Sequence, residues 1–177
     1  ATWAEARPFS LDEPWARVPM DQAVRDAATK TGIPAWLEIV GRQGETRGGT
    51  ALARFLATDF TGSMKEWSKA TPRAKKLDWG NMRKGLAKCD NDGERLFALY
   101  EYLAEPHLIE DYKSKDGTRS LPVFIKDYPF ETSPLARKND LRPDLVHRLA
   151  IFVHGRHPGN GLRAPHAPAA EATRPPA

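Results

Sequence analysis

Apolar residues recur at helical spacing in two separate stretches of the chain, at 21–30 and 92–105. In both stretches the apolar side chains lie three or four residues apart, so they fall on one face of an α-helix. A glycine or a proline follows each stretch and ends the predicted helix. The apolar positions are Ala23, Val24, Ala27, Ala28, Leu96, Leu99, Tyr100 and Leu103. Shorter helices are predicted at 51–56, after Ser63 and at 77–88.

Short runs of β-branched and aromatic residues predict strands at 35–40, 108–112 and 120–127. An Asp-Gly turn between the last two runs favours their pairing as a hairpin. The run at 144–153 suits either a helix or a strand. Because helices and strands alternate, we expect an α/β (α+β) fold, a single domain with a small mixed sheet flanked by helices.

Proline-rich ends divide the chain into three predicted parts. Residues 1–20 place prolines between aromatic residues and are expected to form an extended N-terminal arm. Residues 21–154 carry the expected folded domain. Residues 155–177 are rich in proline and alanine and are expected to form a flexible tail. The length of 177 residues and the hydrophobic content of 40% suit one globular domain.

The composition argues against several classes of protein. The one cysteine, Cys89, excludes a disulfide framework within the chain, and tightly spaced Cys and His ligands for structural zinc are absent. Cys89 follows Lys88, so it is either a reactive thiol or a small buried one. No apolar run reaches about 18 residues, so we expect no membrane insertion. The first residues do not resemble a secretory signal, so we expect a cytoplasmic protein.

Positive charge is concentrated between Lys65 and Lys88, where eight basic residues accompany two acidic ones, in a chain of net charge +4. Such a segment predicts contact with the phosphates of nucleic acid, here DNA. Trp67 and Trp79 could stack on unpaired bases. The alternative is a solvated helix face with both tryptophans as core anchors. The predicted DNA-binding residues are Lys75, Lys76, Arg83 and Lys84.

Three carboxylates stand within five residues, at Asp90, Asp92 and Glu94. Clustered carboxylates can hold Mg²⁺, which prefers oxygen ligands, so Asp90 and Asp92 are the predicted metal ligands. The same residues also fit the start of a helix. In that alternative Asp92 is the N-cap and the helix dipole favours Glu94.

A glycine-rich loop at 41–50 precedes the predicted helix at 51–56. Backbone amides at a helix N-terminus favour anions, so this loop could hold a phosphate, with Arg47 as its basic residue. The loop lacks the Gly-Lys-Ser/Thr sequence of a Walker A motif. A plain glycine-rich loop is the alternative.

The stretch from Asp92 to Leu103 resembles the signature turn and helix of the ParB/sulfiredoxin superfamily, in which an acidic-Gly-x-Arg turn opens a helix. Gly44 to Arg47 is a second candidate for that turn. Across the whole chain, the size, the tryptophan pattern and the opening ARPFSLDEPWARVP resemble the oncogenic-suppression and fertility-inhibition proteins of conjugative plasmids. The chain lacks the Gly-Cys-His-Arg turn of sulfiredoxin, which argues against reduction of a sulfinic acid.

The resemblance implies a ParB/sulfiredoxin-like fold and an ATP-hydrolysing, Mg²⁺-dependent DNase. That enzyme would block transfer of another DNA element through a conjugative type IV secretion system. Gly93, Arg95 and Arg47 would bind the nucleotide, and Glu94 and Arg95 would be catalytic, as a base and as a positive charge. ATP and Mg²⁺ would be cofactors, and the transferred DNA strand and a secretion-coupling component would be partners. The alternative is a DNA-binding or secretion-coupling inhibitor without enzymatic activity.

Overall fold

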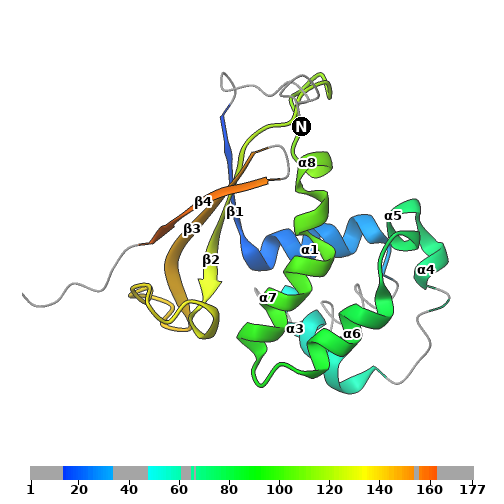
Figure 1. Cartoon of the computed structure of the whole chain (residues 1–177), viewed down its shortest axis with the longest axis horizontal. Helices are drawn as coiled ribbons and strands as arrows, with labels where there is room; N and C mark the ends of the chain where they lie inside the picture. Colours follow the sequence, from blue (N-terminus) through cyan, green and yellow to red (C-terminus); the bar gives the residue numbers. More distant parts are fainter. Residues whose placement is uncertain (1–13, 34–47, 61–64, 66, 154–155, 163–177) are drawn as a thin grey trace, which may run out of the picture.

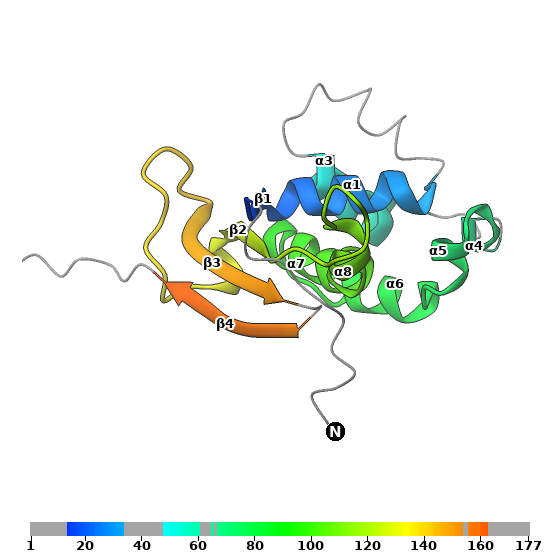
Figure 2. The ribbon, with the colours of Figure 1, turned by 90° about the horizontal axis from the view of Figure 1, so that it is seen from above.

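A sheet lies on one side of the molecule and a layer of helices on the other (Figures 1 and 2). The structure is a computed structural model that describes residues 14–33, 48–60, 65, 67–153 and 156–162. This arrangement confirms the mixed α/β class and the small mixed sheet that the sequence predicts.

The sheet has four strands in the order β1-β2-β3-β4. These are β1 (Ala16–Pro19), β2 (Val123–Pro129), β3 (Leu145–Val153) and β4 (Arg156–Leu162). β1 pairs with β2 in parallel, whereas β2 with β3 and β3 with β4 pair antiparallel. The sheet therefore joins a strand from near residue 16 to three strands that lie more than a hundred residues later in the chain.

The helical layer is built mainly from α1, α6 and α7, with shorter helices around them (Figure 1). The α-helices are α1 (Met20–Thr31), α3 (Gly48–Arg54), α4 (Trp67–Ala70), α5 (Pro72–Lys75), α6 (Trp79–Ala87), α7 (Asp92–Leu103) and α8 (Leu108–Asp111). A π-helical turn η2 (Phe55–Asp59) follows α3, and 3₁₀ turns lie at η3 (Glu105–His107) and η4 (Phe130–Thr132).

The core forms where α1 and α7 pack against each other and against β2. Both helices bury the apolar faces that their spacing predicts, including Val24 and Ala27 on α1 and Leu99 and Leu103 on α7. The sheet adds alternate residues of its strands, such as Ile125 on β2, to the same core. Helical periodicity therefore predicted both central helices correctly.

Local signals explain where several helices begin and end. Gly32 takes a left-handed conformation with φ of 71° and ends α1, as a glycine C-cap does. Thr71 accepts a hydrogen bond from the Ala74 amide and Pro72 occupies the first turn, so α5 begins there. Asp78 caps α6 in the same way, through the Asn81 amide. Pro72 therefore lies between two helices: α4 ends before it and α5 begins at it.

The structure answers two of the strand predictions differently, at 108–112 and at 144–153. The run at 108–112 is not a strand, because Leu108–Asp111 forms α8. Short apolar runs carry too little periodicity to separate the two structures. The ambiguous run at 144–153 is a strand, β3. The predicted strand at 35–40 lies outside the described residues.

The predicted boundaries of the N-terminal arm and the tail stay predictions. β1 places residues 16–19 of the predicted arm in the sheet, and β4 does the same for residues 156–162 of the predicted tail. Both edge strands of the sheet therefore come from segments that the sequence placed outside the folded domain.

Candidate functional site

A cavity of about 370 Å³ opens where the first turns of α1, α3 and α7 meet the end of β2. The turn η4 and the approach to β3 complete its wall. The described lining consists of Pro19, Asp21, Gln22, Arg25, Thr50, Arg54, Asp92, Gly93, Leu96, Asp127, Pro129, Glu131, Arg142, Asp144 and Leu145. Its volume lies in the range of small-molecule sites, about 300–1,000 Å³.

The described lining of the cavity carries more negative than positive charge. It includes five carboxylates and three guanidinium groups, a formal excess of two negative charges. The carboxylates belong to Asp21, Asp92, Asp127, Glu131 and Asp144, and the guanidinium groups to Arg25, Arg54 and Arg142. This balance favours a ligand that carries positive charge.

Asp21 joins α1 to α3 across the cavity wall. Its carboxylate accepts hydrogen bonds from the Gly49 amide (3.1 Å), the Thr50 amide (2.9 Å) and the Thr50 hydroxyl (3.0 Å). A Cβ atom on Gly49 would lie 2.8 Å from the Asp21 carbonyl oxygen, so glycine permits this approach. Asp21 therefore caps the N-terminus of α3 from a neighbouring helix.

Asp92 is held by two arginines. Arg54 donates from Nε (2.9 Å) and from a terminal nitrogen to one carboxylate oxygen, and Arg95 donates to the other (3.0 Å). The hydrogen bonds from Arg54, followed by those from Arg95, lower the pKa of Asp92 below its ordinary value against the opposing effect of burial. Asp92 is therefore an ionised anchor between α3 and α7, and its oxygens are already engaged.

Arg95 stabilises the turn that precedes α7 by hydrogen bonds. Besides Asp92, it donates to the Cys89 carbonyl oxygen (2.9 Å), and its side chain is 19% exposed. It is not part of the described cavity lining. The described contacts of Arg95 stabilise the turn, and its predicted roles in phosphate binding and catalysis stay predictions.

Glu94 takes part in capping α7. Its amide donates to the side chain of Asn91 (2.9 Å), and its carboxylate accepts from the Asp90 amide (2.9 Å). The N-cap is Asn91, one residue before the Asp92 that the capping alternative named. The Glu94 carboxylate thus bonds the amide of the residue before the N-cap, while Asn91 caps the Glu94 amide, so the helix-start interpretation accounts for Glu94. The predicted role of Glu94 as a base stays a prediction.

Gly93 lets the end of β2 approach α7 directly. A Cβ atom there would collide with the Glu131 carboxylate and would lie 2.8 Å from Pro129 Cβ. The space against Gly93, where a phosphate was expected, is thus occupied by a carboxylate. A carboxylate beside the first turn of a helix is favoured by the helix dipole, and it would repel a phosphate.

A β-bulge directs a further carboxylate toward the cavity. The register of β2 and β3 shifts between Lys126 and Tyr128, and Asp127 between them has a φ of 59°. Its carboxylate accepts a hydrogen bond from Arg142 (2.8 Å). Left-handed backbone is uncommon for a residue other than glycine and is concentrated at functional sites.

Two cavity residues keep their charge available for a ligand. Within the described part of the chain, the Arg25 guanidinium and the Glu131 carboxylate have no hydrogen-bond or ion-pair partner. They come from α1 and from η4, so two distant segments place them at the same cavity. Sequence reasoning did not single out either residue. The proline-rich turn after β2 was the available signal for Glu131, since loops that follow strands often carry binding residues.

The predicted metal site gains no support from the described geometry. Among the residues that the structure describes, no three His, Cys, Asp or Glu side chains are grouped to hold a metal ion. Asp90 is exposed and Asp92 is paired with arginines. Arg47, the alternative phosphate ligand, lies outside the described residues. The metal and nucleotide roles stay predictions.

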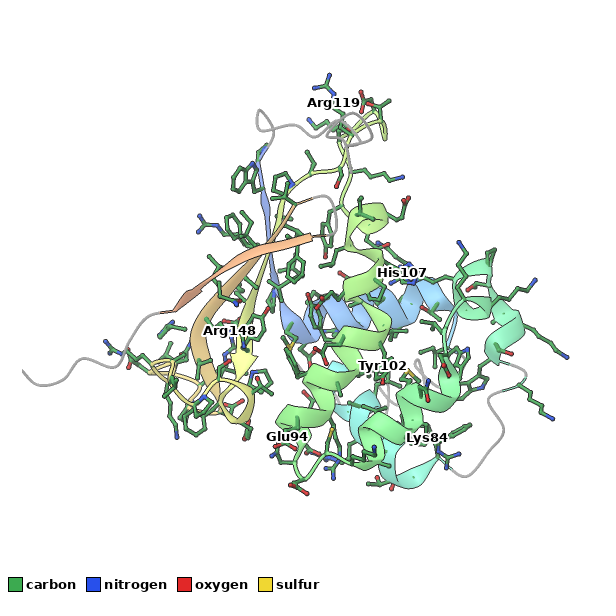
Figure 3. All side chains as sticks on the ribbon, in the orientation of Figure 1. Lys84, Glu94, Tyr102, His107, Arg119 and Arg148 are labelled. Carbon is green, nitrogen blue, oxygen red and sulfur yellow. The ribbon has the colours of Figure 1, made fainter. Side chains whose placement is uncertain are left out.

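The predicted DNA-binding residues lie on a different part of the helical layer. All four are exposed, with Lys75 and Lys76 at the end of α5 and Arg83 and Lys84 on α6. Lys84 is labelled in Figure 3. Arg83 donates to the Phe60 carbonyl oxygen (2.7 Å), and its guanidinium lies over the aromatic ring of Phe60. The DNA-binding role of this segment stays a prediction.

The tryptophans of the basic segment are core anchors. Trp79 is 7% exposed and donates its indole N–H to the Ala74 carbonyl oxygen (2.9 Å). Trp67 packs against Phe60, with ring centroids 4.6 Å apart, and contacts Trp79 at 6.1 Å. The alternative in which these residues anchor the helices is therefore correct for Trp79, which is not available to stack on bases.

Cys89 does not have the environment of an activated thiol. Burial is the largest effect and, with the nearby Glu94 carboxylate, raises the pKa of Cys89 above its ordinary value. The thiol donates to the Gly85 carbonyl oxygen at 3.3 Å. Lys88 therefore does not lower the pKa of Cys89 to that of a reactive thiolate, and Cys89 is a half-buried thiol in this structure.

None of the helices formed by the described residues has the length and apolarity needed to cross a membrane.

Sequence comparison finds relatives among lysine--tRNA ligases. The chain is 29% identical to the lysine--tRNA ligase of Carboxydothermus hydrogenoformans over 158 residues, which cover 89% of this chain and 23% of that protein. It is 33% identical to the enzyme of Serratia proteamaculans over 118 residues, covering 61% of this chain and 21% of the relative. A segment of 70 residues is 41% identical to the Escherichia coli (strain K12) lysine--tRNA ligase. No protein-family model matches the chain.

The chain is thus homologous to lysine--tRNA ligases over most of its length, at modest identity, and spans less than a quarter of the length of these relatives. This finding overturns the resemblance to oncogenic-suppression and fertility-inhibition proteins and the ParB/sulfiredoxin-like assignment. The prediction of a DNase with ATPase activity that blocks conjugative transfer through a type IV secretion system is wrong. The predicted relation to an enzyme holds only in the coarser sense that the relatives are ligases.

Proposed function

We propose that this chain works in tRNA aminoacylation, as the part of a lysine--tRNA ligase-like protein that binds the amino acid. The observation that carries the proposal is the homology to lysine--tRNA ligases along 89% of the chain. The chain matches only 23% of that relative, so the complete ligation reaction is proposed for a longer protein or assembly.

The charge of the cavity suits a basic amino acid. Free lysine carries two ammonium groups and one carboxylate, and it meets a described lining with two more carboxylates than guanidinium groups. Asp21, Asp92 and Asp127 are held by hydrogen bonds or ion pairs within the protein. Glu131 has no such partner among the described residues, so it is the carboxylate that we assign to a ligand ammonium group.

Arg25 supplies the complementary charge at the same cavity. Its guanidinium has no partner within the described residues, and a guanidinium binds a carboxylate through two parallel hydrogen bonds. We assign it to the carboxylate of the amino acid. Together, Arg25 and Glu131 would orient a zwitterion between α1 and η4, with its carboxylate at Arg25 and an ammonium group at Glu131.

ATP and Mg²⁺ enter the proposal only as cofactors of the longer protein. Ester formation from a carboxylate requires activation of that carboxylate, which a nucleoside triphosphate supplies. The described cavity does not fit a polyphosphate, because its excess carboxylates would repel it. We therefore assign no step with ATP or Mg²⁺ to these residues. The cytoplasm, where tRNA is charged, is the compartment that we propose.

Isothermal titration calorimetry with L-lysine tests the proposal. We expect Glu131→Gln to weaken lysine binding by roughly tenfold to a hundredfold, since a hydrogen bond to a charged group contributes about 1.5–3 kcal/mol. Glu101→Gln on the exposed face of α7 makes the same chemical change away from the cavity and should leave the affinity within about twofold. Equal effects of the two variants would remove Glu131 from the site.

A further inference from the structure

Five lysines on consecutive short elements of the helical layer carry uncompensated charge. All are exposed, and within the described residues none has a hydrogen-bond or ion-pair partner for its ammonium group. They are Lys69, Lys75, Lys76, Lys84 and Lys88, which we call the lysine surface. α4, α5 and α6, which carry or precede them, lie on the side of the helical layer farthest from the sheet in both views (Figures 1 and 2).

Helical geometry keeps these charges in solvent. On α6, Trp79, Met82 and Leu86 face the core at spacings of three and four. Lys84 lies on the opposite face, and Lys88 follows it by four residues at the C-cap of the helix. Neighbouring like charges on one helix face repel each other, so nothing in the fold itself favours this arrangement.

Arg73, which lies between Lys69 and Lys75 in the chain, is paired within the described part of the protein, unlike the five lysines. Arg73 donates to both oxygens of Asp111 (2.9 Å each) and to the Leu103 carbonyl oxygen (2.9 Å), and its side chain is 12% exposed. It joins α5 to the end of α7 and to α8. The ion pair removes Arg73 from the free charge of the segment, so the lysines alone are available to a partner.

The chemistry of the lysine surface matches a phosphate backbone better than a protein. Protein interfaces depend on buried aromatic or apolar anchors, whereas phosphate contacts need only flexible cations. The exposed large apolar residues in the described structure, Leu135 and Leu141, lie between η4 and β3, away from α4–α6. The indole of Trp79 is buried, so the surface offers charge without base stacking.

One end of the lysine surface is separated from the cavity wall by only a few residues of the chain. Lys88 precedes Asp92, a cavity residue, by four positions, so their Cα atoms are at most about 14 Å apart. We propose that the lysine surface binds the phosphate backbone of a tRNA and leads its acceptor end toward the cavity. This inference rests on the proposed function for the identity of the nucleic acid, while the charge distribution supports the contact with phosphates.

Fluorescence anisotropy with a labelled lysine tRNA transcript tests the inference between 50 and 200 mM salt. We expect steeply salt-dependent binding, because each lysine–phosphate contact releases counterions. Lys76→Glu with Lys84→Glu should weaken binding by about tenfold or more and lower the log–log salt slope by about two. The matched control is Lys115→Glu with Arg119→Glu, which makes the same change of net charge at a distant loop (Figure 3). The control should change the affinity by less than about twofold.

Three outcomes would overturn the inference. They are equal losses in the two double variants, absence of tRNA binding by the unmodified chain at the lowest salt, and tighter binding of duplex DNA than of tRNA. Circular dichroism of each variant checks that a loss does not come from unfolding. Lysine binding in calorimetry is independent of this assay. A chain that binds tRNA through the lysine surface but does not bind lysine would keep the inference and refute the proposed amino-acid site.

Discussion

The cavity and the lysine surface are both rich in charge, yet they use it in opposite ways. In the cavity, Asp92 is paired with Arg54 and Arg95, and Asp127 is paired with Arg142. Arg54–Asp92 joins α3 to α7 and Arg142–Asp127 joins β2 to the segment before β3, whereas Arg95–Asp92 braces the first turn of α7. On the lysine surface the charges have no described partner.

The difference shows which charges hold the fold and which are left for a ligand. Arginine makes most of the structural pairs because its planar guanidinium can bond a carboxylate and a carbonyl oxygen together. Within the described part of the chain, Glu131 and Arg25 in the cavity and the five lysines of the lysine surface have no such pair. Removing a paired charge should therefore affect stability, whereas removing an unpaired charge should affect binding.

The largest expected effect is on the free energy of unfolding, and it should differ between two basic residues that are two positions apart, Arg73 and Lys75. Arg73→Ala should lower the free energy of unfolding by about 3 kcal/mol, because it leaves the largely buried Asp111 with Lys30 as its one ion-pair partner among the described residues. Lys75→Ala, at an exposed position, should change it by less than about 0.5 kcal/mol. Urea unfolding of both variants measures the difference, and equal effects would break the distinction between paired and unpaired charge.

A smaller loss is expected where glycine allows η4 to approach α7. Gly93→Ala should destabilise the protein by about 1–3 kcal/mol, because the new Cβ would collide with Glu131 and Pro129. Gly80→Ala on α6 is the control, since its Cβ would meet only Asp78 at an ordinary 3.6 Å. That control should be neutral or stabilising by up to about 1 kcal/mol. Thermal unfolding compares the two, and similar midpoints would contradict the close packing at Gly93.

The smallest effect should depend on pH. Arg54 and Arg95 lower the pKa of Asp92, so Asp92 contributes stability above its unfolded pKa of about 4 and loses it as pH falls through its folded pKa. Asp92→Asn should therefore cost about 1 kcal/mol at pH 7 and less at pH 3, since the pair is partly exposed. Asp90→Asn, at an exposed neighbour, is the control. A cost independent of pH would contradict the ionised pair.

The sequence predicted the elements whose signal is local. α1 and α7 show regular apolar spacing along about three turns, and both form where that spacing indicated. The four-residue helix α8 was mistaken for a strand because its run is too short to show a period. The pairing of β1 with β2 joins residues about a hundred positions apart, and no local pattern encodes such a contact.

The site was harder to predict because the same residue types can either bind a ligand or cap a helix. The acidic-Gly-x-Arg turn at α7 suggested a phosphate site, but Asn91 and Glu94 show that the same residues cap a helix. Glu131 and Asp127 became candidates only when a β-bulge and the turn η4 brought them to the cavity. The sequence showed that residues 65–88 are basic. It did not show that Arg73 pairs with Asp111 while the neighbouring lysines stay unpaired among the described residues.

Titration of the chain with L-lysine, and separately with L-glutamate, tests the central claim most directly. An amino-acid site with excess negative charge and the free carboxylate of Glu131 predicts saturable binding of lysine and at least about tenfold weaker binding of glutamate. Equal affinity for the two amino acids, or no binding of lysine by the folded chain, would contradict the assignment of the cavity.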